Sequence, residues 1–163
     1  MKQLLLIRHA KSSWDDLSIA DFDRPLNERG KADAPRMAKR LRNNEVKIDA
    51  FISSPAKRAR KTAEYFAHEF KRDKEDILLK EELYLAGPAE FTRVICNADD
   101  KYECIAVFSH NEGITQFANS LTDAKTDNIP TAGIFAVKIS AKHWKDFPEA
   151  EKEFWFFDFP KKE

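Results

Sequence analysis

The sequence contains little cysteine: its 163 residues include two, Cys96 and Cys104. They form no Cys-x-x-Cys pair and lie near no cluster of histidines. This spacing argues against a disulfide framework and against the usual zinc motifs. We therefore interpret both as reduced, partly buried thiols.

Net charge and long hydrophobic runs are also missing. The chain has 28 Lys plus Arg and 28 Asp plus Glu, whereas nucleic-acid-binding proteins normally carry a basic excess. The basic run 57–61 has helical phase, so we interpret it as the solvated face of a helix. No apolar run approaches the ~20 residues of a membrane span, and the N-terminal one is too short for a signal peptide. We expect a cytoplasmic protein that binds neither nucleic acid nor membranes.

The chain does contain short apolar runs that alternate with segments of helical spacing. Its length fits one domain over residues 1–163. We expect strands over 3–7, 50–52, 77–79, 104–108, 133–139 and 154–159. We expect one helix from Glu28, capped by Asn27, and another after Ser54-Pro55, with Ser54 as the cap and Pro55 at the first helical position. Two further helices are expected over 89–98 and 113–121. This alternation predicts an α/β fold with a mostly parallel sheet. Residues 8–25 are polar and irregular, and long loops of this kind are often functional.

Three of the expected strands run into side chains suited to binding an anion. The first ends in Arg8-His9, the second leads through Ser54 to Arg58 in the first helical turn, and 104–108 leads to His110. Ligands of open α/β sheets bind beyond the carboxyl ends of the strands, so these groups should converge. The set has two imidazoles, two guanidiniums and no metal-ligand spacing. It predicts a phosphate site that needs no metal or other cofactor.

The chemistry follows from these residue types. A neutral imidazole can attack phosphorus, and neighbouring guanidiniums disfavour its protonated form, which keeps His9 nucleophilic. Guanidiniums also bind phosphate oxygens through two hydrogen bonds and stabilise charge during transfer. His110 can donate a hydrogen bond to the transferring group. His68 and His143 lack such neighbours, and we interpret both as surface residues.

Three segments resemble the motifs of the histidine phosphatase (phosphoglycerate mutase-like) superfamily. They are Leu5-Leu6-Ile7-Arg8-His9-Ala10, the run 53–64 that begins Ser53-Ser54-Pro55, and Ser109-His110-Asn111. The segments 11–14, 23–30 and 83–86 are similar to the SixA-type phosphohistidine phosphatases of that superfamily.

This resemblance implies a three-layer α/β/α sandwich, phosphoglycerate mutase-like, without a cap domain. It implies that His9 is the nucleophile and becomes a covalent phosphohistidine. Arg8, Arg58 and His110 would form the rest of the phosphate pocket. Arg24 and Asn111 would contact the substrate.

The sequence departs from the pattern of this superfamily at two places. Ala10 replaces the glycine that usually follows the histidine. Larger relatives have a glutamate after the third strand that protonates the leaving group, and Leu85 occupies that place here. We name Glu112, Glu81 and Glu82 as the candidate proton donors.

We expect a metal-independent phosphatase that acts on phosphohistidine in a protein, such as a phosphohistidine relay protein. A phosphatase of small phosphate esters remains open, and so does a catalytically silent phosphoprotein-binding module. The intact His9 favours an enzyme, because a module that only binds has no need of a nucleophile. We expect the protein to be a monomer.

Overall fold

The computed structural model describes residues 1–162, and its six strands form one sheet in the order β3-β2-β4-β1-β5-β6. The strands are β1 (Lys2–Arg8), β2 (Ala50–Ser53), β3 (Leu78–Leu79), β4 (Cys104–Ser109), β5 (Ile134–Ile139) and β6 (Lys152–Asp158). The helices are α1 (Glu28–Asn43), α2 (Lys57–Glu69), α3 (Pro88–Cys96) and α4 (Gly113–Asn119). Four 3₁₀ turns complete the described elements: η1 (Asp21–Asp23), η2 (Lys74–Asp76), η3 (Glu81–Leu83) and η4 (Trp144–Asp146).

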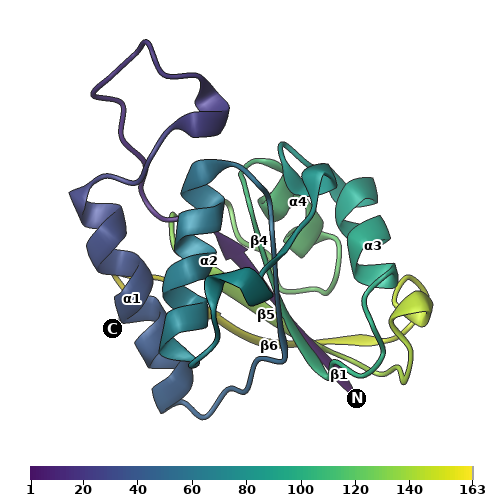
Figure 1. Ribbon diagram of the computed structural model, residues 1–163. Helices are drawn as coiled ribbons and strands as arrows, with labels where there is room; N and C mark the ends of the chain where they lie inside the picture. The colour runs from purple at the N-terminus through teal and green to yellow at the C-terminus, as the bar shows by residue number, and fades with distance from the viewer. Residues whose placement is uncertain (163) are drawn as a thin grey trace.

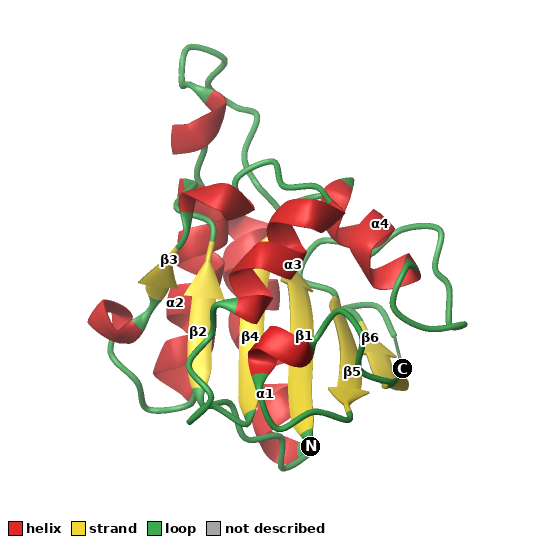
Figure 2. Cartoon of the chain, turned by 90° about the vertical axis from the view of Figure 1, so that its right-hand side faces the viewer, coloured by secondary structure: helices red, strands yellow, loops and turns green. Residues whose placement is uncertain are grey.

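The sheet is mixed, with a parallel half that carries the predicted strand ends. β1 pairs with β4, β4 with β2 and β2 with β3, all in parallel. β5 runs antiparallel to both of its neighbours, β1 and β6. Figure 2 shows β1, β2 and β4 pointing to the same edge of the sheet, while β5 points the other way. The predicted mostly parallel α/β sheet is confirmed, and β5 is its antiparallel member.

Two helical layers cover the sheet because the side chains of each strand alternate between its faces. Leu5 and Ile7 of β1 join the core beneath α1 and α2. Leu4 and Leu6 join a second core beneath α3 and α4. Figure 1 shows the sheet between these two pairs of helices. The structure therefore has the expected α/β/α sandwich.

Most predicted elements are confirmed, and α2 begins later than expected. The sequence predicts that Ser54 caps α2 with Pro55 at its first position, but the helix begins at Lys57. The Ser54 hydroxyl lies 2.8 Å from His110 Nε2 and accepts a hydrogen bond from the amide of Ala56. The Ser54 hydroxyl therefore contacts His110 at the end of β4 and does not cap α2.

Beyond the end of β1 at Arg8, the predicted long loop of residues 8–25 projects from the α/β body and is fixed at its base (Figure 1). Asn27 caps α1 by accepting a hydrogen bond from the amide of Gly30 at 2.8 Å, as expected. Gly30 lies so close to the chain that a Cβ there would be 2.1 Å from the carbonyl oxygen of Lys11. The start of α1 is therefore packed tightly against the start of the loop.

None of the helices described between residues 1 and 162 has the length and apolarity that membrane crossing needs.

Candidate active site

The two predicted histidines meet at the carboxyl edge of the sheet. Arg8 of β1 pairs with Ser109 of β4, so the residues that follow, His9 and His110, leave adjacent strands side by side. Their ring centroids are 5.3 Å apart. β2 is the other neighbour of β4 and brings Ser54 to His110. Parallel pairing therefore brings together the groups that the sequence placed at three strand ends.

The environment of His9 fixes its tautomer and keeps its ring neutral. Its side chain is buried, and Nδ1 lies 2.7 Å from the carbonyl oxygen of Ala10. A carbonyl can only accept, so Nδ1 donates and Nε2 keeps its lone pair. Burial, with a smaller effect of the guanidiniums of Arg58 and Arg8, lowers the pKa of His9 to about 3, against the opposing effect of the Ala10 hydrogen bond. The expected effect of the arginines is present, with burial as the larger cause.

His110 is the second neutral imidazole. Only 2% of it is exposed, and burial together with His9 and Arg58 lowers its pKa to about 3. Nε2 lies beside the hydroxyl of Ser54, whereas Nδ1 is buried and finds no hydrogen-bond partner within residues 1–162. The rings of Tyr84 and His110 pack in a T-shaped arrangement, with centroids 5.5 Å apart.

Three arginines surround the imidazoles, and protein acceptors hold all three by their terminal nitrogens. Arg8 donates from Nη1 to the carbonyl oxygen of Ile129 at 2.9 Å, and burial followed by the charge of Arg58 lowers its pKa. Arg58, in the first turn of α2, is 3% exposed and donates to Asp21. Arg24 comes from the projecting loop, where its guanidinium stacks on the exposed ring of Trp14, with Cζ 3.8 Å from the ring centroid.

Buried side-chain atoms without a hydrogen-bond partner are concentrated in this pocket. Among residues 1–162, four buried side-chain nitrogen or oxygen atoms lack a partner, and all four belong to it. They are Nε of Arg8, Nε of Arg24, Nε of Arg58 and Nδ1 of His110. Buried polar groups are normally paired, so such a cluster marks a functional site. Its chemistry, three guanidinium N–H groups and an imidazole nitrogen, suits a phosphate group.

Sequence reasoning missed Asp21 and Tyr84. The carboxylate of Asp21 accepts hydrogen bonds from Arg24, Arg58 and Tyr84, the last at 2.6 Å. These three contacts lower the pKa of Asp21 to about 2, against the opposing effect of partial burial. The hydrogen bond to the Asp21 carboxylate raises the pKa of Tyr84. Neither residue lies in a periodic segment. The signals in the sequence were the position of Asp21 in the long polar loop and that of Tyr84 in the segment 83–86, which resembles the SixA-type phosphatases.

The structure does not join four other predicted residues to the pocket. The side-chain amide of Asn111 donates to Asn128 and accepts from Thr115. The three candidate donors have exposed side chains, and among residues 1–162 none of them hydrogen-bonds to the imidazoles or arginines of the pocket; they are Glu112, Glu81 and Glu82. The proposed roles of these residues stay predictions.

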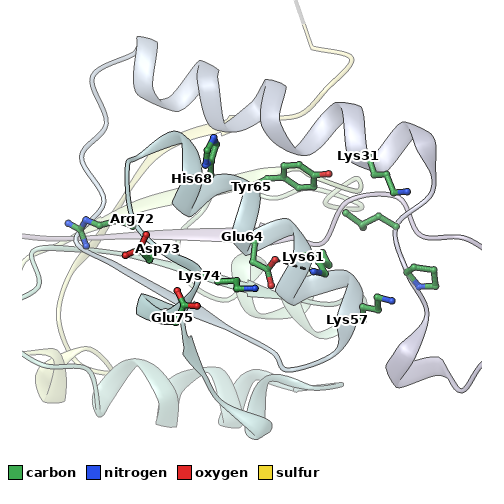
Figure 3. A pocket seen from close by; sticks show the side chains of 12 residues that line it. Lys31, Lys57, Lys61, Glu64, Tyr65, His68, Arg72, Asp73, Lys74 and Glu75 are labelled. Carbon is green, nitrogen blue, oxygen red and sulfur yellow. Dashed lines mark hydrogen bonds and ion pairs between the residues drawn. The ribbon is translucent and has the colours of Figure 1, made fainter.

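The predicted basic helix face borders a separate surface groove of about 700 Å³ (Figure 3). Lys57 and Lys61 of α2 line it opposite Lys31 of α1, and Lys61 pairs with Glu64 at 3.2 Å. Arg58 is buried and absent from this lining. Within the basic run, Lys57 and Lys61 therefore lie on a solvated face, whereas Arg58 lies in the phosphate pocket. Within residues 1–162, no three His, Cys, Asp or Glu side chains are grouped to hold a metal ion.

Comparison with known proteins agrees with this geometry. The profile of the histidine phosphatase superfamily (branch 1) matches residues 4–84. An uncharacterised protein of Mycobacterium tuberculosis is 33% identical over 150 residues, covering 86% of this chain and 90% of that protein. A chloroplastic protein of Arabidopsis thaliana is 48% identical over 61 residues, and this match spans 37% of the chain but 28% of that protein. A solved structure from Agrobacterium tumefaciens, assigned as the phosphohistidine phosphatase SixA, has a TM-score of 0.81 at 24% identity and covers 98% of both chains.

Proposed function

The chain belongs to the histidine phosphatase superfamily, and from this we propose that it hydrolyses phosphohistidine in proteins through a phosphoryl group carried on His9. Membership supports a phosphatase, and so a hydrolase. The identity of the substrate is our proposal. It rests on one observation, the pair of buried neutral imidazoles among three arginines, beside which residues 1–162 place no proton-donating carboxyl group.

In the first step, Nε2 of His9 attacks the phosphorus atom of the substrate. The hydrogen bond from Nδ1 to the carbonyl of Ala10 holds the ring in the tautomer that leaves Nε2 free. The guanidiniums of Arg8 and Arg58 stabilise the charge on the phosphoryl oxygens. The new P–N bond to His9 forms as the P–N bond of the substrate breaks, and the substrate ring, which carries a proton on its other nitrogen, departs as neutral imidazole.

In the second step, water attacks the phosphorylated His9, releases inorganic phosphate and restores the neutral ring. With the Ser54 hydroxyl donating to Nε2 of His110, Nδ1 of His110 carries the hydrogen. That N–H then supplies one more donor to the transferring group.

The nature of the leaving group favours phosphohistidine over phosphate esters. An alkoxide requires a proton donor in the transition state, whereas an imidazole leaves readily because its conjugate acid has a pKa of about 6.5. Asp21, with a pKa of about 2, is ionised at neutral pH and has no proton to give. Tyr84 has a raised pKa and is a weaker acid than ordinary tyrosine. The pocket therefore suits a substrate that needs little acid catalysis.

A protein substrate fits the surface beside the pocket. The projecting loop exposes four large hydrophobic side chains: Trp14, Leu17, Ile19 and Phe22. Leu17 is 85% exposed. Exposed apolar groups gathered on one loop are typical of surfaces that bind other macromolecules.

The test compares phosphohistidine and phosphoserine in peptides of matched sequence. We expect kcat/KM for phosphohistidine to be higher by at least ~10²-fold, the lower end of what a general acid contributes. His9→Ala, with a blank for spontaneous hydrolysis, supplies the background. Equal efficiency on both peptides would contradict the proposal and point to a proton donor, with Glu112, Glu81 and Glu82 to be mutated in that order. Binding without turnover in the wild type would identify a silent binding module instead.

A further inference from the structure

The pocket arginines share a pattern that the proposed mechanism does not use. Each donates from terminal nitrogens to the protein, and each keeps a buried Nε–H without an acceptor. A guanidinium presents its donors as a rigid fork with two usable edges, one formed by the two Nη groups and one that includes Nε. The protein therefore holds the Nη end of these arginines, and the edge that includes Nε remains for an anion.

Asp21 holds the Nη end of two of the three arginines, Arg58 and Arg24. Its backbone carbonyl accepts from Nη1 of Arg58 at 2.7 Å, and its Oδ2 accepts from Nη2 of the same guanidinium at 3.0 Å. Its Oδ1 accepts from Nη2 of Arg24 at 3.2 Å. One residue thus fixes the plane of Arg58 through two contacts and links it to Arg24.

The hydrogen bonds that Asp21 accepts also connect three separate segments of the chain. Arg58 belongs to α2, Arg24 to the projecting loop, and Tyr84, whose hydroxyl donates to Oδ2, follows η3. The Tyr84 ring also makes edge-to-face contacts with the rings of His110 and Phe22, with centroid distances of 5.5 Å and 5.2 Å. The position of the loop and the orientation of the phosphate donors therefore depend on the same carboxylate.

We infer that Asp21 is a positioning residue, which holds Arg58 and Arg24 so that their Nε edges face the phosphoryl group. The inference rests on the proposed function only in treating this pocket as the phosphate site. A carboxylate that blocked the pocket would instead compete with phosphate for the arginines. Positioning is favoured because Asp21 engages the Nη atoms and leaves Nε of both guanidiniums unpaired.

The test is Asp21→Asn, which keeps the shape and removes the charge. The control is Asp23→Asn, the same change in the same 3₁₀ turn at a side chain that makes no hydrogen bond or ion pair among residues 1–162. Calorimetry measures the binding of inorganic phosphate and of orthovanadate, which mimics the transition state. The ratio of the two dissociation constants is informative, because lost charge affects both anions similarly while misplaced donors weaken the transition-state mimic more.

We expect Asp21→Asn to reduce the preference for vanadate over phosphate by ~10-fold or more and to lower kcat by a similar factor. Asp23→Asn should leave both unchanged. Tyr84→Phe, which spares both arginine contacts, should keep most of the preference. An unchanged preference in Asp21→Asn would overturn the inference, and tighter binding of both anions with normal kcat would identify a competing anion. A wild type that binds vanadate but does not cleave phosphohistidine would refute the proposed substrate and leave the binding test of Asp21 valid.

Discussion

The two buried imidazoles should make the protein unusually sensitive to acid. His9 and His110 both have a pKa of about 3 in the folded protein, against 6.5 for an ordinary histidine. Between these values the unfolded chain binds more protons than the folded one, so stability falls as the pH falls below about 6.5. Linkage gives a loss of about 2 kcal/mol per imidazole between about pH 7.5 and about pH 5, or about 4 kcal/mol for the pair. This is a large part of the 5–15 kcal/mol that typically holds a domain folded.

Urea denaturation at those two pH values measures the effect. The wild type is compared with the double variant His9→Gln/His110→Gln, which removes both imidazoles and leaves the other titrating groups in place. The wild type should lose about 4 kcal/mol more than the variant on acidification. Any difference in stability at neutral pH cancels in this comparison. Equal pH dependence in the two proteins would show that the imidazoles are not held neutral by the fold, and the account of the nucleophile would fail with it.

Three further results are expected. His9→Ala should abolish turnover. A brief incubation of the wild type with labelled substrate should trap an acid-labile phosphoenzyme, which His9→Ala should lack. Near-normal rates in this variant would refute covalent catalysis at His9. Arg58→Ala should lower kcat/KM by ~10²-fold or more, with Arg58→Lys a poor substitute, because both lose the planar fork. Arg60→Ala is the matched control, since Arg60 pairs with Glu64 outside the pocket, and a larger loss there would mean that the wrong arginine was chosen. Activity should survive exhaustive EDTA treatment, and a loss reversed by Mg²⁺ or Zn²⁺ would contradict metal-independent catalysis.

The sequence predicted the strand-end part of the site because parallel pairing has a simple geometric consequence. Apolar runs mark buried strands, and parallel neighbours deliver the residues that follow them to one edge. That rule placed His9, His110 and Arg58 together, and the structure confirms it. It could not predict that β5 runs antiparallel, because apolar composition carries no information about strand direction.

The loop contribution was harder to predict because no periodicity governs residues 8–25. Arg24 was expected from the resemblance alone, and its position depends on stacking over Trp14 and on a hydrogen bond to Ser12. Asp21 reaches the pocket through contacts with segments more than 35 residues away in the chain. Such contacts depend on the tertiary fold, and single-sequence spacing does not encode them.

The burial that makes the pocket costly to fold is the property that makes it useful. An unpaired buried polar group typically costs about 1–3 kcal/mol, and four of them gather here beside two imidazoles that resist protonation. In a folded protein selected only for stability, water or protein acceptors would satisfy these donors. A tetrahedral anion brings several acceptor oxygens and negative charge, so it can pair the three Nε–H groups and an imidazole N–H at once. The cost is therefore offset when phosphate is bound, and most fully as charge develops on the oxygens during transfer, which is where catalysis requires the interaction to be strongest.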